Sequence, residues 1–201
     1  MNPEDRQPAR STSAPPPERA RRMPRAERRE QLLDAATRAF ARTGFAATGL
    51  DDVAAEAGVT HVILYRHFAS KSDLYRAVLD RACTRLAETV GTDDYDEHSV
   101  AALLRAAAAD PDGFRLLFRH AAREPEFRDV IESIRSASME IAARHLADAI
   151  PDGPWRTWAA QLVPTLTLEA VITWLDTGQP DPDHAAERIR QAVQGVIQAA
   201  Q

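Results

Sequence analysis

Positions 60–63 carry side chains that could recognise the edge of a base in double-stranded DNA: Thr60, His61, Val62 and Ile63. Imidazole can hydrogen-bond a base edge, and apolar side chains can contact a thymine methyl group. These residues follow a break at Gly58 and open a short helical segment that extends to about Phe68. A helix in this position presents its first residues to the major groove when a preceding helix supports it. Thr60 also suits a helix cap, and the two roles are compatible.

Lys71 is the only lysine among the 25 basic residues, and it opens the next helical segment. A compact ammonium suits a phosphate, and the unpaired N–H groups at a helix start favour anions. Ser70 is the expected cap of this helix, with Asp73 three residues later. This arrangement predicts a phosphate contact by Lys71.

The elements that must position these residues form a helix-turn-helix. Leu50–Ala57 is a short helical segment, and Ala54 and Ala57 are small enough for a close helix crossing. Gly58 can adopt the left-handed turn conformation. Val59 and Leu64 are expected to fill the interface between the two helices.

Residues 27–80 resemble the DNA-binding domain of the TetR family of transcriptional regulators, and the motif that carries the resemblance lies within residues 48–74. It reads Thr48-x-x-x-x-Val53-Ala54-x-x-Ala57-Gly58-Val59-Thr60, followed by Leu64-Tyr65-x-His67-Phe68-x-Ser70-Lys71-x-x-Leu74. The later stretch Trp174-Leu175-Asp176-x-Gly178-x-Pro180-Asp181-Pro182 is similar to the family's connection between its last two helices. The chain departs from the family at Val62, where glycine is most common, so its groove-facing surface must differ.

The resemblance implies a bacterial, cytoplasmic homodimer that acts as a transcriptional repressor and needs no cofactor or metal. Thr48 and Tyr65 resemble the family's hydroxyl contacts to phosphate, and His67 and Lys71 resemble its cationic or donor contacts. Residues 61–63 occupy its base-reading positions. The partners would be a near-palindromic double-stranded operator and a small apolar or amphipathic ligand that relieves binding. Taken alone, Tyr65 also suits a core aromatic, and His67 suits a surface or satisfied core histidine. Thr48 and Thr60 suit plain helix caps.

The chain as a whole predicts an all-α fold of about nine helices. Residues 1–24 hold six of the 13 prolines and little apolar surface, which indicates a disordered Arg/Pro-rich tail. Arginines 21, 22, 25, 28 and 29 either reach DNA or remain a solvated charge run. We expect a helix-turn-helix domain over 25–70 and a regulatory and dimerisation bundle over 71–201. Its helical stretches are 98–109, 111–122, 125–149, 154–177 and 182–200.

The last two helical stretches are apolar enough to form half of a four-helix dimer interface. Only Glu169 is charged between Thr157 and Leu175. The expected interface residues are Ile172, Leu175, Ile189, Val193, Val196 and Ile197. The alternative is that both helices pack only within their own subunit.

A ligand pocket inside the bundle would be apolar with a few polar anchors. The candidate lining residues are Met139, Trp158, Thr165 and Trp174. Each of them also suits plain core packing.

The charge is distributed unevenly along the chain. Residues 1–80 carry 13 basic and 11 acidic side chains, whereas residues 81–201 carry 12 basic and 19 acidic ones. A polyanion is therefore expected to bind at the N-terminal end.

The sequence also disfavours several other classes of protein. No stretch approaches the roughly 20 apolar residues of a membrane helix, and no apolar export segment precedes Leu32. Cys83 is the only cysteine, which favours a reducing cytoplasm and excludes a cysteine zinc site. No catalytic motif is present, so an enzyme is disfavoured. An adaptor that has lost DNA binding is disfavoured by the intact Tyr65, His67 and Lys71.

Overall fold

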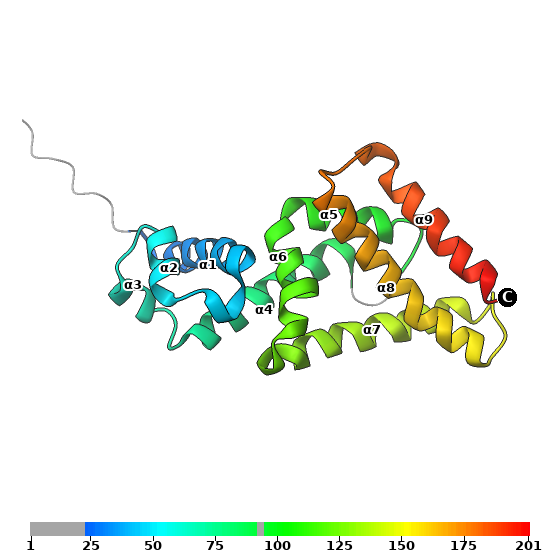
Figure 1. The fold of residues 1–201 in the computed structure, drawn as a ribbon, viewed down its shortest axis with the longest axis horizontal. Helices are drawn as coiled ribbons and strands as arrows, with labels where there is room; N and C mark the ends of the chain where they lie inside the picture. Colours follow the sequence, from blue (N-terminus) through cyan, green and yellow to red (C-terminus); the bar gives the residue numbers. More distant parts are fainter. Residues whose placement is uncertain (1–22, 92–94) are drawn as a thin grey trace, which may run out of the picture.

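The computed structural model describes residues 23–91 and 95–201, so the expected 1–24 tail lies almost entirely outside the described residues. Within the described ranges the chain is all-helical and contains no strand, as predicted. The helices run in the order α1 (Arg25–Ala47), α2 (Leu50–Glu56), α3 (His61–Tyr65), α4 (Lys71–Val90), α5 (Ser99–Ala109), α6 (Pro111–Arg115), α7 (Arg128–Leu146), α8 (Pro154–Asp176) and α9 (Pro182–Ala199). Helices α1–α3 form one end of the molecule and α7–α9 reach the other, with α4 running between them (Figure 1).

One predicted helix, 111–122, is divided in the structure. After α6 the chain continues as a π-helical turn, η1 (Leu116–His120), and a 3-10 turn, η2 (Ala121–Arg123). A second 3-10 turn, η3 (Pro125–Phe127), then precedes α7, which ends at Leu146 rather than at the predicted residue 149. Short π-helical and 3-10 segments redirect the chain, so residues 116–127 can pack under α1 and α4.

The first hydrophobic core joins the two expected domains. Its α1 contribution is a helical stripe that includes Leu33, Ala36 and Phe40. Four residues from the second half of the chain are also fully buried in it: Leu116, Leu117, Ala121 and Phe127. The helix-turn-helix end therefore shares its core with the bundle.

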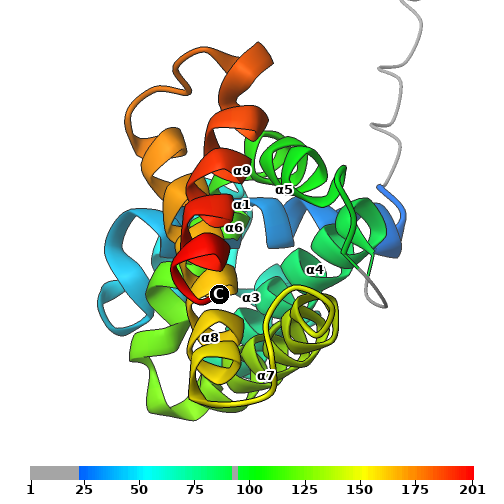
Figure 2. The ribbon, with the colours of Figure 1, turned by 90° about the vertical axis from the view of Figure 1, so that its right-hand side faces the viewer.

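The bundle surrounds α8, which packs against α7, α9 and α5. Turned by 90°, Figure 2 shows α4, α5, α7, α8 and α9 arranged around a common axis. One cluster, which includes Leu104, Phe114, Val171, Ile172 and Ile189, binds α5 to α8 and α9. This packing places the ends of α4 and α7 beside the middle of α8, where the cavity described below is found.

Candidate DNA interface and ligand cavity

The turn between α2 and α3 has the geometry of a helix-turn-helix. Gly58 has a φ of 64°, a conformation that costs glycine little, and the Val59 amide donates to the Ala54 carbonyl at 3.0 Å. Val53 on α2 and Leu64 on α3 are both fully buried. The two helices thus pack through one face, and the other face of α3 is turned outward.

The outward face of α3 is apolar and exposed. Val62 is 62% exposed and Tyr65 is 52% exposed, although both are large hydrophobic side chains. Thr60 is exposed as well, whereas Ile63 is half-buried. Thr60 is the N-cap of α3, but its side chain makes no cap hydrogen bond, so its hydroxyl is available to a partner.

His61 is held by a neighbouring carboxylate that the sequence analysis did not identify. Its Nδ1 lies 3.1 Å from Oδ1 of Asp51 in the first turn of α2, and its ring centroid lies 4.7 Å from that of Tyr65. Its Nε2 is buried and has no hydrogen-bond partner among the described residues. A base contact by His61 therefore requires its ring to turn away from Asp51.

The structure corrects the expectation for Thr48. Its side chain is buried, with 1% exposure, and its hydroxyl is hydrogen-bonded to the Gly44 carbonyl at 2.7 Å and to the Thr43 hydroxyl at 2.7 Å. A hydroxyl held in this way fastens the residue after α1 back onto α1 and does not face solvent. Gly49, and not Thr48, is the N-cap of α2.

Lys71 is bound to the end of α1. Its Nζ donates to the carbonyl of Phe45 at 2.8 Å and to that of Ala46 at 3.4 Å, and it lies 4.4 Å from the centroid of the Phe45 ring. An ammonium has three donors, so one remains for a phosphate. Ser70 caps α4 as predicted, because its hydroxyl accepts from the Asp73 amide.

His67 is half-buried beside three arginines. Burial, followed by the charges of Arg25, Arg29 and Arg28, lowers the pKa of His67 below its ordinary value. The imidazole is therefore neutral at pH 7 and can donate a hydrogen bond without carrying a charge. Cationic groups at this surface come instead from the arginines of α1.

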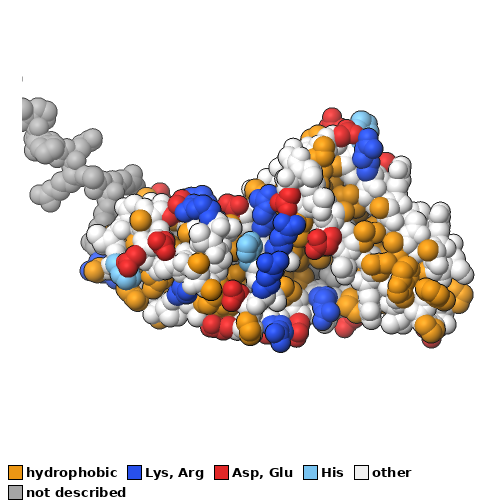
Figure 3. All heavy atoms as spheres, viewed as in Figure 1, with side chains coloured by type: hydrophobic (Ala, Val, Ile, Leu, Met, Phe, Trp, Pro, Cys, Tyr) orange, Lys and Arg blue, Asp and Glu red, His pale blue; other side chains and the backbone are white. Residues whose placement is uncertain are grey.

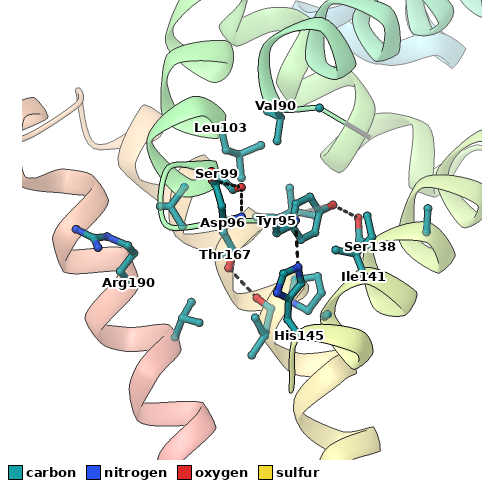
Figure 4. Close-up of a pocket in the computed structure, with 18 of the residues that line it drawn as sticks. Val90, Tyr95, Asp96, Ser99, Leu103, Ser138, Ile141, His145, Thr167 and Arg190 are labelled. Atoms are coloured by element: carbon teal, nitrogen blue, oxygen red, sulfur yellow. Dashed lines mark hydrogen bonds between the residues drawn. The ribbon is translucent and has the colours of Figure 1, made fainter. Parts of the chain in front are cut away.

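A cavity of about 730 Å³ lies in the bundle, at the far end of α4 from α3. Its walls are mostly apolar, and the residues that line it include Leu86, Val90, Leu103, Phe118, Ile134, Ile141, Val163, Leu168, Val193 and Ile197. Figure 4 shows that Tyr95, Ser138, His145 and Thr167, four of its polar lining residues, are hydrogen-bonded within the protein. The Tyr95 hydroxyl lies 3.0 Å from the Ser138 hydroxyl, His145 Nε2 accepts from the Tyr95 amide at 3.2 Å, and Thr167 donates to the Val163 carbonyl at 2.8 Å.

The four expected lining residues do not line this cavity. Met139 follows the lining residue Ser138 on α7, so its side chain lies on a different face of that helix. Trp158 is 40% exposed, and Thr165 is exposed with its hydroxyl bonded to the Gln161 carbonyl. Trp174 packs on the core of α5, α8 and α9, and its indole N–H donates to the Pro180 carbonyl at 2.9 Å. The cavity face of α8 instead carries residues 163, 164, 167 and 168.

The expected dimer interface is also corrected in part. Ile172, Leu175 and Ile189 are buried in the core of their own subunit, which is the alternative considered above. Val193 and Ile197 line the cavity. Val196 is half-buried and lies outside both sets. The outer face of α8 has exposed apolar side chains instead, and Figure 3 shows hydrophobic groups gathered over this part of the molecule.

These features define a class of protein: a helix-turn-helix DNA-binding regulator with an all-helical C-terminal bundle. Residues 32–78 match the family described as bacterial regulatory proteins, tetR family. The chain is 32% identical over 187 residues to the HTH-type transcriptional activator FasR of Mycolicibacterium smegmatis, and the alignment covers 84% of this chain and 82% of that protein. The chain belongs to the tetR family, whose members are DNA-binding regulators and not enzymes.

Other comparisons agree with this assignment. The HTH-type transcriptional repressor Rv3405c of Mycobacterium tuberculosis is 46% identical over 68 residues, which is 33% of this chain and 36% of that protein. A TetR-like regulator from Rhodococcus sp. RHA1 shares the fold with a TM-score of 0.74 at 24% identity, over 86% of this chain and 97% of that one. Regulators of this family bind operator DNA as dimers. No helix in the described ranges has the length and apolarity needed to cross a membrane.

Proposed function

We propose that this regulator is a cytoplasmic repressor that binds a near-palindromic operator as a homodimer and is released by an apolar or amphipathic ligand in the bundle cavity. The observation that carries the proposal is the exposed apolar face of α3, with Val62 and Tyr65 turned to solvent at the opposite end of α4 from the cavity. Exposed apolar groups on a short helix N-terminus suit contact with thymine methyl groups in a major groove.

The phosphate contacts come from residues around α3. Tyr65 offers an exposed hydroxyl, His67 a neutral imidazole and Lys71 the remaining donor of its ammonium. Such contacts position the protein on DNA without reading its sequence. The base-reading group is then Thr60, His61, Val62 and Ile63, with His61 turning from Asp51 to make its contact.

The cavity supports a ligand of low polarity. Tyr95, Ser138 and Thr167 already hydrogen-bond one another or the backbone, so a ligand that bonds to these side chains would have to break existing hydrogen bonds. The polar side chains of α9 at the cavity, among them Glu187 and Arg190, suit the polar end of an amphipathic ligand. Such a ligand weakens operator binding only if it prefers a bundle conformation that misplaces the two α3 helices. We assign DNA binding to residues 25–70 and regulation to residues 71–201. The core that the two parts share lies between them.

The outer face of α8 is our proposed dimer surface. Trp155 is 62% exposed and Trp158 40%, and their rings pack edge-to-face at 5.6 Å. Leu162 and Leu166 continue the same stripe at helical spacing and are half-buried. Of the interface residues expected from the sequence, we keep only Val196 on α9 in this proposed surface.

A second candidate function is transcriptional activation. The similarity to the activator FasR extends over 84% of this chain, whereas the similarity to the repressor Rv3405c is limited to 33%. Both functions use the same operator contacts, so they differ only in the sign of the effect on transcription.

The test is binding of the purified chain to the DNA upstream of its own gene, measured by fluorescence anisotropy at two salt concentrations. Val62→Glu should abolish specific binding because it places a carboxylate against the bases and phosphates. The matched control is Ala147→Glu, an exposed position beyond the end of α7. Transcription in vitro from the bound promoter then separates repression from activation, and equal binding by both variants would refute the assignment of α3.

A further inference from the structure

An aromatic cluster joins the bundle to the helix-turn-helix end. Phe127, the last residue of η3, is fully buried between Phe45 at the end of α1 and Tyr75 on α4. The ring centroid of Phe127 lies 5.1 Å from that of Phe45 and 4.7 Å from that of Tyr75. Phe45 and Tyr75 are themselves 4.9 Å apart. Each ring therefore contacts the other two, and none can move without displacing its neighbours.

Phe127 is fixed to the helix that forms one wall of the cavity. It is the N-cap of α7, and the cavity-lining residues Ile134, Ser138 and Ile141 follow it on that helix. The step of seven residues from 134 to 141 keeps Ile134 and Ile141 on one face of α7, and Ile134 also packs against the core that contains Phe127. Packing contacts therefore run from the cavity wall along α7, through Ile134, to the core around Phe127.

Arg76 on α4 binds the turn η3 that contains Phe127. Its guanidinium donates to the Glu126 carbonyl at 3.2 Å and to the Asp129 carboxylate at 3.3 Å, and it lies 5.4 Å from the centroid of the Phe127 ring. These contacts hold Phe127 in its place from the solvent side. The position of the ring is then set by α4 and α7 together.

The ammonium of Lys71 also contacts Phe45. The face of the Phe45 ring lies 4.4 Å from Nζ, and the Phe45 carbonyl accepts from the same atom at 2.8 Å. A continuous set of contacts therefore runs from the cavity wall on α7 through Phe127 and Phe45 to Lys71.

We propose that Phe127 is a positioning residue that couples the cavity to operator binding: it sets the place of the Phe45 ring and so the place of the Lys71 ammonium. The inference rests on the proposed function, because it takes Lys71 as a phosphate contact and the cavity as the ligand site. A ligand that displaces α7 moves Phe127, and Lys71 then loses its alignment with the phosphate. Coupling of this kind is measured by double-mutant cycles rather than assumed from proximity.

The first experiment measures the coupling between Phe127 and Lys71. Operator affinity is determined by fluorescence anisotropy for the native chain, Phe127→Leu, Lys71→Met and the double variant. We expect Lys71→Met to cost at least about 5-fold less affinity in the Phe127→Leu background than in the native one. The matched control is Phe114→Leu, which removes a buried phenylalanine from the other core and should leave the effect of Lys71→Met unchanged.

The second experiment uses a side chain in place of a ligand. Ile141→Trp adds volume on the cavity face of α7, where Ile141 is 4% exposed. We expect this substitution to weaken operator binding at least about 5-fold when Phe127 is present and less than 2-fold in the Phe127→Leu background.

Circular dichroism confirms that each variant is folded, and Phe127→Met replaces Phe127→Leu if the latter does not fold. Additive effects in both cycles would overturn the role of Phe127 while leaving operator binding intact. Absence of operator binding by the folded native chain would instead refute the proposed function, so the two failures are distinct.

Discussion

The ammonium of Lys71 and the side chain of Phe45 are in direct contact, with Nζ 4.4 Å from the ring centroid and 2.8 Å from the Phe45 carbonyl oxygen. The chain places its only lysine at this point, where a cation satisfies backbone carbonyls at the end of α1. The sequence assigned Lys71 to phosphate binding alone. The contact gives this side chain a structural role as well, and the two roles can be separated by experiment.

Lys71→Met should reduce both stability and operator affinity. Loss of the cation–π contact and the carbonyl hydrogen bonds should lower the free energy of unfolding by about 1–2 kcal/mol. Loss of one phosphate contact should weaken binding to all sequences alike and flatten the plot of log K against log salt by about 0.9 per subunit. Lys71→Arg keeps the charge and is the control. An unchanged salt slope for Lys71→Met would remove Lys71 from the phosphate contacts.

His61→Ala should change which sequences are bound. We expect it to relax the preference at one or two base pairs and to cost on the order of 1–3 kcal/mol at the cognate site. Asp51→Ala should instead strengthen binding to all DNA, because it removes an exposed carboxylate from the groove-facing surface and releases the imidazole. Selection from an operator library measures both effects. Unaltered base preference in His61→Ala would leave base reading to Val62 and Ile63.

Operator affinity should depend on pH through His67. Burial and the neighbouring arginines lower its pKa in the unbound chain, and a phosphate in contact with the ring would raise that pKa in the complex. The complex then binds more protons than the separate molecules, so affinity should rise as pH falls through and below about 6.5. His67→Gln should flatten this dependence. His184→Gln, a change in an exposed histidine of α9, should leave it intact.

Tyr75→Phe should stabilise the chain. The Tyr75 hydroxyl is buried and has no hydrogen-bond partner among the described residues, and burial raises its pKa. Replacing an unsatisfied buried hydroxyl by hydrogen should add about 1 kcal/mol to the free energy of unfolding. Because the folded-state pKa is raised, the native chain loses stability as pH rises above about 10, and the variant should lose less. Chemical denaturation at pH 7 and pH 10.5 measures both; a less stable variant at pH 7 would indicate a hydrogen bond to the hydroxyl.

Trp158→Asp should dissociate the dimer if the outer face of α8 forms its interface. A twofold interface repeats the substitution, so two carboxylates would be desolvated. Sedimentation velocity should report a monomer for this variant and a dimer for the native chain. Ile197→Glu is the control variant. Because Ile197 lines the cavity, its replacement should leave the dimer intact. The reverse pattern would restore α9 as the main dimer surface.

Local sequence determined the helices and the helix-turn-helix. Capping residues, proline positions and apolar spacing depend on near neighbours in the chain, and they placed α2, α4, α5 and α9 to within a residue or two. The exposed face of α3 followed from the same pattern, because Val59 and Leu64 had to be buried against α2. The family assignment rested on this stretch and is confirmed by the similarity to FasR over 84% of the chain, together with the family match over residues 32–78.

Tertiary packing decided which face of each later helix meets which neighbour. Helix α8 is apolar nearly all round, so its sequence did not distinguish the cavity face at Thr167 from the outer face at Trp158 or the core face at Ile172. Three further features also depend on packing: the burial of Thr48, the contact of Asp51 with His61, and the contact of Phe127 with Phe45. Each of them brings together residues from different turns or different helices of the chain. Periodicity reports only that a helix has an apolar face. Which partner covers that face depends on the three-dimensional arrangement of all the helices, and so the cavity and the aromatic cluster of Phe45, Tyr75 and Phe127 became visible only in the folded chain.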